Sequence, residues 1–303
     1  MPDKIWAAVS SELATTTATA GKSVVAVLGR RHPSSGILFR PDAIVTASHA
    51  LRRDDEITVI TGPGQKLKAQ LAGRDAGTDI AVLRLEHSLD ALPAAWSSTS
   101  NLRVGELVLA LGRTWRGNIT ASSGILSGLV PGPWRTWRNG ELDQFIRPDL
   151  TLYPGFSGGP LVASSGEFLG LNTAGLHRSG ITIPANTVQR VAAELLEKGA
   201  IERPYLGLGM QPVALPESLR SKLNLTGSDA LMVAHLDAGG PADKAGVLLG
   251  DLLIELGSHG LQEIENVQNV LRSAKAGQEI ETKLIRAGAV TTLKIKVEAR
   301  PAR

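Results

Sequence analysis

Short apolar runs bounded by turn residues recur along the first part of the chain. Such runs are too short for most helices and are typical of buried or half-buried strands. Glycine (33 residues) and proline (16 residues) are abundant enough to supply turns between the runs. The spacing predicts a mostly β fold with two small antiparallel barrels in succession. The runs lie at Val24–Leu28, Gly36–Phe39, Ala43–Thr46, Ile57–Ile60, Ile80–Leu85, Leu107–Leu111, Ile119–Leu126, Gly159–Ala163 and Phe168–Asn172.

The pattern changes to helical spacing near residue 184. The segment Pro184–Lys198 starts with proline, repeats apolar residues at helical intervals and is followed by Gly199, so we predict a helix there. Residues Ala200–Pro204 are then expected to form a linker. A chain of 303 residues is long enough for two domains that each bury a core. We therefore expect one domain over residues 1–203 and a small α+β domain over residues 204–303.

The composition excludes several kinds of site. The chain has no cysteine, which rules out disulfides, thiolate zinc sites and a cysteine nucleophile. The formal net charge is +3 without a dense run of lysine and arginine, so we expect no nucleic-acid partner. No metal or organic cofactor is indicated, and any covalent chemistry must use an oxygen or nitrogen nucleophile.

The sequence shows neither a secretory signal nor a membrane-spanning stretch. Its first residues lead from Trp6 into a segment rich in threonine and alanine that lacks a continuous apolar core. If Met1 is the native start, we expect a cytoplasmic protein. If an export signal has been removed, we expect a periplasmic one, so the sequence leaves the compartment open.

Ser157 lies in the glycine-rich segment Gly155–Pro160, which reads GFSGGP. Glycines permit a tight turn that exposes a hydroxyl group and aims backbone N–H groups at a developing oxyanion. A serine hydroxyl needs a base to take its proton and a carboxylate to hold that base in the right tautomer. Ser157 is therefore a candidate nucleophile if a histidine and an acid accompany it.

His49 and Asp79 are the candidates for that base and that acid. His49 follows an apolar strand within TASHA, where the rim of a barrel would present it. Asp79 heads the apolar strand of TDIAVL, and a buried carboxylate there needs a cationic or N–H partner, which a histidine ring supplies. The other histidines lack such a context and are expected on the surface or in loops: His32, His87, His177, His235 and His259.

The motifs TASHA, TDIAVL and GFSGGPL, in the order His, Asp, Ser, resemble the chymotrypsin superfamily and its HtrA/Deg branch in particular. This resemblance implies a chymotrypsin-like double β-barrel and a serine endopeptidase that cleaves unfolded or damaged polypeptides through an acyl-enzyme. It implies His49 as general base, Asp79 as its orienting acid and Ser157 as nucleophile. The N–H groups of Gly155 and Ser157 would be the oxyanion donors. Family members usually assemble as trimers or larger cages, so a homo-oligomer is also expected.

An α/β-hydrolase is an alternative, because GFSGG also satisfies the G-x-S-x-G pattern of its nucleophile elbow. That fold requires a helix directly after the serine, and then an acid and a histidine further along the chain. Here Gly158–Val162 indicates a turn that enters a strand, and both partners precede the serine. The order of the motifs therefore argues against this alternative.

Phe156 departs from the family pattern, since HtrA-like proteases usually carry asparagine before the nucleophile and digestive relatives carry aspartate. The turn thereby loses a polar side chain that could brace it. Either Phe156 packs beneath the loop and holds it, or the oxyanion turn is collapsed. The second possibility leaves a catalytically inactive peptide-binding scaffold as the alternative function.

By the same resemblance, the substrate pocket is expected at Thr151–Pro154 and Leu171–Gly175. Neither stretch contains an acidic residue, so we expect a small or medium apolar side chain at the cleavage position, and not lysine or arginine. The edge formed by Thr173, Ala174 and Gly175 would pair with the substrate backbone as an added strand.

The turn-rich segment Pro131–Gly140 carries two tryptophans and two arginines. Its aromatic side chains have two interpretations. They contact a substrate or a lipid surface, or they fold back onto their own domain, as loop aromatics more often do.

The segments YLGL (205–208), GPADKAGV (240–247) and GDLL (250–253) resemble a PDZ domain of the HtrA type. The loop is expected to offer backbone N–H groups to the carboxylate of a peptide C-terminus while the neighbouring sheet edge accepts a strand. The helix Ile264–Lys275 would line the other side of that groove. The expected peptide-binding residues are Leu206, Gly207 and Leu208. Three apolar helix positions face either the groove or the core, namely Val267, Val270 and Leu271.

Overall fold

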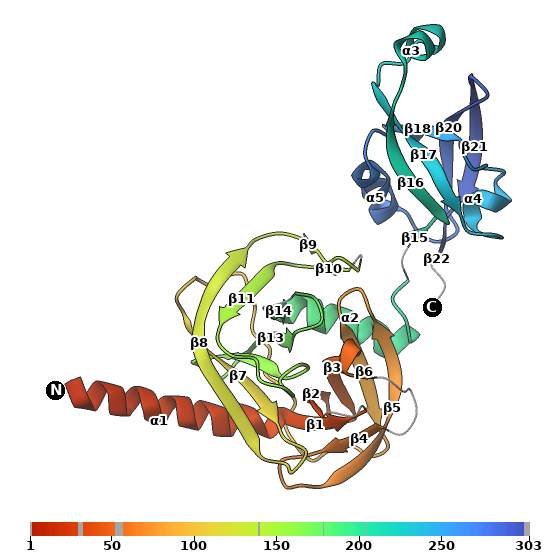
Figure 1. Ribbon diagram of the computed structural model, residues 1–303. Helices are drawn as coiled ribbons and strands as arrows, with labels where there is room; N and C mark the ends of the chain where they lie inside the picture. The colour runs from red at the N-terminus through yellow and green to blue at the C-terminus, as the bar shows by residue number, and fades with distance from the viewer. Residues whose placement is uncertain are drawn as a thin grey trace. The chain divides into compact units, whose positions relative to one another are not determined.

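The computed structural model describes residues 2–29, 33–51, 57–138, 140–177, 179–202 and 204–299, so His32 lies outside the described residues. The chain forms two compact units, Met1–Ile201 and Glu202–Arg303 (Figure 1). The first unit contains two closed barrels, and the second contains one principal sheet with short helices. The expected mostly β architecture, with two barrels followed by a small α+β unit, is confirmed.

Six strands form the first barrel: β1 (Val24–Leu28), β2 (Ser34–Arg40), β3 (Ala43–Ala47), β4 (Ile57–Ile60), β5 (Lys66–Asp75) and β6 (Ile80–Leu85). They are neighbours in the closed order β1-β2-β3-β6-β5-β4. In the antiparallel pair β3–β6, Ala47 lies opposite Ile80. His49 follows β3 and Asp79 precedes β6, so this register brings the two candidate residues to the same rim of the barrel.

Six further strands close the second barrel: β7 (Leu107–Arg113), β8 (Ile119–Val130), β11 (Phe145–Asp149), β12 (Pro160–Ala163), β13 (Phe168–Thr173) and β14 (Ile181–Pro184). Their order is β11-β14-β13-β12-β7-β8. The loop between β11 and β12 carries Ser157. This loop is tied to β13, because Gly158 N–H donates to Asn172 O at 2.9 Å and Asn172 N–H donates to Gly159 O at 2.8 Å. A small hairpin, β9 (Trp134–Arg135) and β10 (Glu141–Leu142), lies in the loop before β11.

The predicted helix at residues 184–198 is present as α2 (Ala185–Lys198), with Pro184 as its N-cap. Gly199 ends it in the left-handed conformation (φ 76°), which glycine adopts without steric cost. The buried residues of α2 recur at helical spacing and pack against β5, β6 and β13. α2 thus covers the first unit with an amphipathic face.

A second long helix, α1 (Pro2–Ala20), was not expected from the sequence. Its threonine and alanine residues carry no strong apolar stripe, so the periodicity gave no helical signal. Tertiary contacts hold its C-terminal half, where Leu13 packs on the core and Thr16 Oγ1 donates to Ser164 O at 3.1 Å. Within the described part of the chain, none of the helices combines the length and hydrophobicity needed to span a bilayer.

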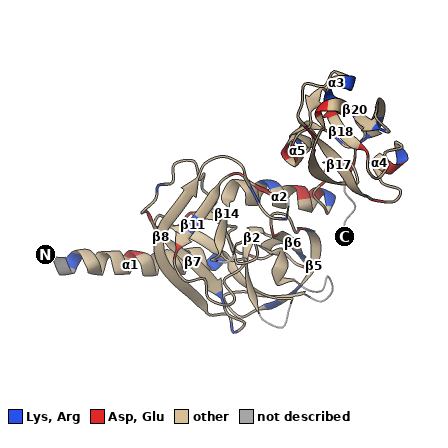
Figure 2. Ribbon diagram, turned by 45° about the horizontal axis from the view of Figure 1, so that its top comes forward, with Lys and Arg blue, Asp and Glu red and all other residues tan. Residues whose placement is uncertain are grey.

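The second unit contains a sheet in the order β16-β17-β18-β20-β21, with β19 beside β18 and a separate pair β15–β22. Lys/Arg and Asp/Glu residues both occur on its helices (Figure 2). The elements are β15 (Pro204–Tyr205), β16 (Leu208–Ala214), α3 (Glu217–Leu223), β17 (Asp229–Leu236), α4 (Pro241–Lys244), β18 (Leu252–Leu256), β19 (His259–Gly260), α5 (Ile264–Ser273), β20 (Glu279–Arg286), β21 (Ala289–Lys296) and β22 (Glu298–Ala299).

Three details of the second unit differ from the sequence expectations. Helix α3 was missed, and α5 ends at Ser273 because Ala274 turns to an extended backbone (ψ 151°). The expected linker Ala200–Pro204 is wrong at its last residue, since Pro204 pairs with Ala299; Arg203 lies outside the described residues. The core interpretation of the α5 side chains is confirmed for all three, because Val267 and Val270 are buried in the core and Leu271 packs against it.

Candidate active site

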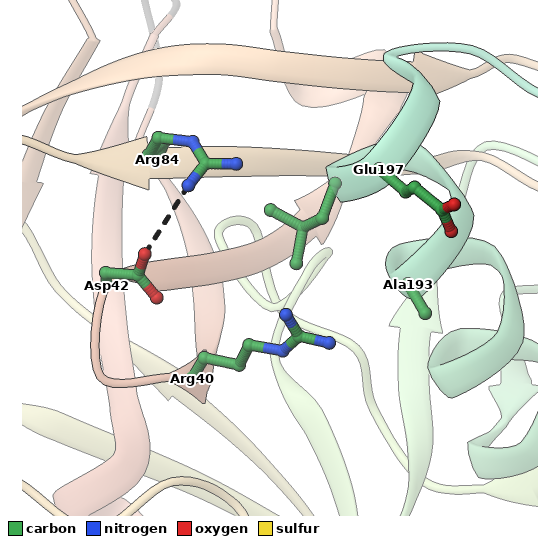
Figure 3. Close-up of a pocket in the computed structure, with 6 residues that line it drawn as sticks. Arg40, Asp42, Arg84, Ala193 and Glu197 are labelled. Carbon is green, nitrogen blue, oxygen red and sulfur yellow. Dashed lines mark ion pairs between the residues drawn. The ribbon is translucent and has the colours of Figure 1, made fainter.

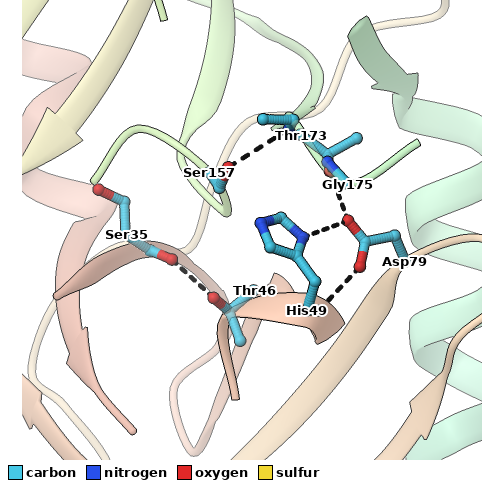
Figure 4. Close-up of polar contacts among 8 residues, drawn as sticks. Ser35, Thr46, His49, Asp79, Ser157, Thr173 and Gly175 are labelled. Carbon is cyan, nitrogen blue, oxygen red and sulfur yellow. Dashed lines mark hydrogen bonds and ion pairs between the residues drawn. The ribbon is translucent and has the colours of Figure 1, made fainter. Parts of the chain in front are cut away.

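His49 lies against a fully buried carboxylate at the rim of the first barrel (Figure 4). Its Nδ1 atom is 2.7 Å from Asp79 Oδ2, and its backbone N–H donates to Asp79 Oδ1 at 2.8 Å. The Thr173 hydroxyl donates to Asp79 Oδ2 as well. A carboxylate accepts from Nδ1–H, which leaves Nε2 of the neutral ring as a proton acceptor.

The Asp79 turn is held on both sides. Asp79 itself has a left-handed backbone (φ 59°), which is uncommon for a residue with a side chain. Its carbonyl accepts from Ser48 N–H at 2.9 Å. Just before it, the Asp75 carboxylate accepts from the N–H groups of Gly77 and Thr78, each at 3.1 Å. These hydrogen bonds on both sides of Asp79 hold it in its left-handed conformation.

Ser157 lies on the side of the His49 ring that faces away from Asp79 (Figure 4). The turn around it uses two left-handed glycines, Gly155 (φ 96°) and Gly158 (φ 85°). A Cβ at residue 158 would lie 2.1 Å from Ser35 O, so the close approach of the turn to β2 requires glycine. The structure therefore brings the three residues of the predicted triad together at the junction of the two barrels.

Two backbone donors of this turn remain available. Among the described residues, neither Gly155 N–H nor Ser157 N–H donates to a protein acceptor. The intervening Phe156 N–H is occupied, since it donates to Tyr153 O at 3.0 Å. Unpaired N–H groups beside a nucleophile are the arrangement that stabilises an oxyanion.

Comparisons with known proteins agree with this geometry. A family model for a trypsin-like peptidase domain matches residues 34–171, and a model for a PDZ domain matches residues 204–297. The Serine protease Do-like HtrA of Bacillus subtilis (strain 168) is 32% identical over 284 residues, which covers 88% of this chain and 63% of that protein. The chain belongs to the HtrA family.

Other relatives support this membership. A probable periplasmic serine endoprotease DegP-like from Halomonas elongata is 32% identical over 267 residues, covering 86% of this chain and 55% of that protein. This HtrA chain therefore spans between about half and two thirds of the length of these two relatives. The solved structure of HtrA-type protease AlgW with tripeptide aligns at 26% identity and a TM-score of 0.69, covering 96% and 98% of the two chains. The structure of the serine endoprotease from Yersinia pestis aligns at 24% identity and a TM-score of 0.73, covering 94% of this chain and 97% of that chain. At this identity, the likeness supports the fold alone.

Phe156, the departure from the usual HtrA pattern, is buried beneath the turn. Its side chain is 3% exposed, belongs to the core cluster with Leu126 and Leu161, and has its ring centroid 5.6 Å from that of Tyr153. A Cβ at Gly112 would lie 2.6 Å from the Phe156 ring, so the ring fills its space tightly. The interpretation that Phe156 packs beneath the loop fits these contacts.

Truncation of Phe156 to alanine should lower the free energy of unfolding by about 3 kcal/mol, because the ring leaves a cavity in a close-packed core. Urea denaturation of the wild type and the variant measures this difference. Trp137→Ala is the matched control, since that aromatic side chain is 69% exposed and its loss should change stability by less than about 0.5 kcal/mol. Equal stability of Phe156→Ala and the wild type would contradict the packing role.

The expected substrate edge divides between two environments. Thr173 is fully buried and its hydroxyl serves Asp79, a role that the sequence analysis missed. Ala174 is exposed and its N–H donates to Ser157 Oγ at 3.3 Å. Gly175 N–H donates to Thr173 Oγ1 at 2.9 Å. The Thr173 side chain is therefore turned inward, and Ala174 is the exposed residue of this segment.

The two tryptophans of the segment Pro131–Gly140 also lie in different environments. The Trp134 ring packs against Phe145, with centroids 5.0 Å apart, which fits the folding-back interpretation. Trp137 is exposed and lies under the Arg138 guanidinium at 4.4 Å. Thr136 between them is buried, and its hydroxyl donates to Gly77 O at 2.7 Å, so the loop also contacts the Asp79 turn.

In the second unit, the expected peptide-binding segment precedes an edge strand. Leu206 is buried and its carbonyl accepts from Ala242 N–H at 2.9 Å. Gly207 is left-handed (φ 76°) and its carbonyl accepts from Asp237 N–H at 3.0 Å. Leu208 begins β16, which stands at one end of the sheet order and packs against α5. An edge strand beside a helix is the site at which a peptide can add as a further strand.

A separate hollow of about 300 Å³ lies between the β2–β3 turn, β6 and α2 (Figure 3). It contains none of the triad candidates, and its Asp42 carboxylate is paired with Arg84 at 3.5 Å. Its lining residues are Arg40, Asp42, Arg84, Ala193, Leu196 and Glu197. No cluster of three or more metal-ligating side chains occurs among the residues that the structure describes.

Proposed function

We propose that this HtrA chain is a serine endopeptidase with His49, Asp79 and Ser157 as its catalytic triad. The observation that carries the proposal is the contact of 2.7 Å between His49 Nδ1 and the buried Asp79 carboxylate, with Ser157 on the opposite side of the ring. A buried acid, an oriented imidazole and a serine in a glycine turn form the set needed for acyl transfer.

In this mechanism, Ser157 Oγ attacks the carbonyl carbon of the scissile peptide bond while His49 Nε2 takes the hydroxyl proton. The oxyanion of the tetrahedral intermediate accepts hydrogen bonds from the N–H groups of Gly155 and Ser157. The imidazolium then gives its proton to the leaving amine, and the C–N bond breaks to leave an acyl-enzyme. Water, deprotonated by His49, releases the acid and restores Ser157.

The substrates are proposed to be unfolded or damaged polypeptides that add to the edge at Thr173, Ala174 and Gly175 as a strand. A small or medium apolar side chain is the proposed preference at the cleavage position. Support comes from the absence of acidic residues in the two segments that flank the site, Thr151–Pro154 and Leu171–Gly175.

The second unit is proposed to bind peptide C-termini at Leu206, Gly207 and Leu208, in the groove between β16 and α5. We place the boundary between the protease and PDZ domains at residues 203 and 204. The AlgW structure was solved with a tripeptide, which supports peptide binding by a relative of this chain. By resemblance to the family, a homo-oligomer, and a trimer in particular, is part of the proposal.

A fluorophosphonate probe tests the proposed activity, because only an activated serine displaces its fluoride. We expect labelling of the wild type at Ser157, found by mass spectrometry of the digested protein, together with degradation of casein. Ser157→Ala should show neither. An unlabelled wild type that still binds a peptide with an apolar C-terminus would contradict the protease and favour the inactive scaffold.

A further inference from the structure

Ser35 in β2 joins the first barrel to the turn that carries Ser157. Its side chain is fully buried. The Ser35 hydroxyl donates to Gly155 O at 2.7 Å and accepts from Arg113 N–H at 2.9 Å. Its backbone N–H donates to Ser157 O at 3.0 Å. One residue of β2 thus holds the carbonyl groups on both sides of Phe156–Ser157.

These contacts orient the peptide groups of the turn. The peptide group between Gly155 and Phe156 is held at both ends, by Ser35 Oγ on its carbonyl and by Tyr153 O on its N–H. The group between Ser157 and Gly158 is likewise held, by Ser35 N–H and by Asn172 O. The Ser157 N–H belongs to the peptide group between these two, and the Gly155 N–H belongs to the peptide group that precedes them. Neither donates to an acceptor among the described residues. Fixing these carbonyl groups keeps the N–H donors pointed at the position where the substrate's carbonyl oxygen becomes the oxyanion.

The backbone carbonyl of Ser35 is also held by a hydrogen bond. Thr46 Oγ1, in the strand that leads to His49, donates to Ser35 O at 2.7 Å (Figure 4). The donor to the Ser35 hydroxyl is the backbone N–H of Arg113, at the end of β7, and the buried guanidinium of the same residue donates to the carbonyls of Gly21, Val24 and Gly117. Burial lowers the pKa of this guanidinium, as expected where water is excluded.

We propose that Ser35 is a positioning residue that holds the oxyanion turn open, an inference that rests on the proposed endopeptidase function. The residue before the nucleophile supplies no polar brace to the turn, because the side chain at residue 156 is an apolar ring packed in the core. The Ser35 hydroxyl supplies a brace from the opposite barrel. Its action is on the backbone donors, and not on substrate contacts or on the histidine.

The neighbouring Ser34 offers a matched control. It lies in the same strand and is 5% exposed, but its hydroxyl has no hydrogen-bond partner within the described residues. Removing either hydroxyl deletes the same atom from the same strand. Only removal of the Ser35 hydroxyl also leaves Gly155 O without its donor.

The test compares Ser35→Ala, Ser34→Ala and the wild type in steady-state cleavage of one fluorogenic peptide and in the rate of fluorophosphonate labelling. Ser35→Ala is expected to lower kcat and the labelling rate about 10-fold to 100-fold, below the loss for deleting an oxyanion donor outright, with KM within about twofold. The pH profile of kcat/KM should keep the apparent pKa of the base. Ser34→Ala should match the wild type.

Two results would overturn the inference: Ser35→Ala with wild-type kcat and labelling, or a raised KM at unchanged kcat. If thermal unfolding shows that Ser35→Ala does not fold, Ser35→Cys, which replaces the hydroxyl with a somewhat larger thiol that donates only weakly, is measured in its place with the same expectation. A wild type that is neither labelled nor active would instead overturn the proposed function, which separates the two failures.

Discussion

Replacing Asp79 with asparagine is expected to lower kcat for peptide cleavage about 10⁴-fold while the fold is retained. The Asp79 carboxylate accepts from His49 Nδ1, from His49 N–H and from the Thr173 hydroxyl. An amide of the same shape has one acceptor oxygen, and its NH₂ group facing Nδ1 moves the ring proton to Nε2. The imidazole can then no longer take the proton of Ser157.

Steady-state cleavage of a fluorogenic peptide measures this loss, and circular dichroism checks the fold. Asp42→Asn is the control with the same chemical change, because that carboxylate is 44% exposed and, among the described residues, makes only a 3.5 Å ion pair with Arg84. Exposed pairs contribute little, so its kcat should equal that of the wild type. Asp79→Asn activity within tenfold of the wild type would show that Asp79 does not orient the base.

A Gly175→Ala substitution should lower kcat about 10²-fold, because the new methyl group falls inside the His49–Asp79 contact. A Cβ at residue 175 would lie 2.5 Å from His49 Nδ1 and 2.6 Å from Asp79 Oδ2. Real carbon atoms do not approach so closely, so the imidazole must move away from the carboxylate. Displacement of about 1 Å in a catalytic group is sufficient for losses of this order.

The measurement is kcat and fluorophosphonate labelling of Gly175→Ala beside Gly128→Ala. Gly128, in β8 of the same unit, is a suitable control because its added Cβ would meet nothing closer than 3.5 Å and its φ is not in the left-handed range. We expect wild-type kcat for Gly128→Ala. Normal cleavage by Gly175→Ala would mean that the His49–Asp79 contact is not needed in this geometry.

The fold was predictable where it depends on local patterns. Each of the nine strand-like runs found in the sequence overlaps a strand of one of the two barrels, and α2 begins one residue after Pro184. Apolar periodicity and turn residues are local signals, so they can be recognised in the sequence without knowledge of the tertiary structure. Helices α1 and α3 were missed because neither has a buried apolar stripe strong enough to be recognised; α3 contains no buried residue at all.

The candidate site was predictable only in part. His49, Asp79 and Ser157 could be singled out because each stands in a distinctive motif beside an apolar strand, and the structure places them at one junction. The parts played by Thr173 and Ser35 could not be found this way. Serine and threonine occur at many strand positions, and their roles here depend on partners about a hundred residues distant in the sequence.

The sequence by itself determined the mostly β class, the division into two barrels and a following α+β unit, and the order His, Asp, Ser of the candidate catalytic residues. Tertiary structure alone decided which hydroxyl serves Asp79, which residue holds the turn around Ser157, and how Phe156 is accommodated. The physical reason is that strands and turns follow from local periodicity. Hydrogen bonds between distant strands follow only from the register in which the barrels close.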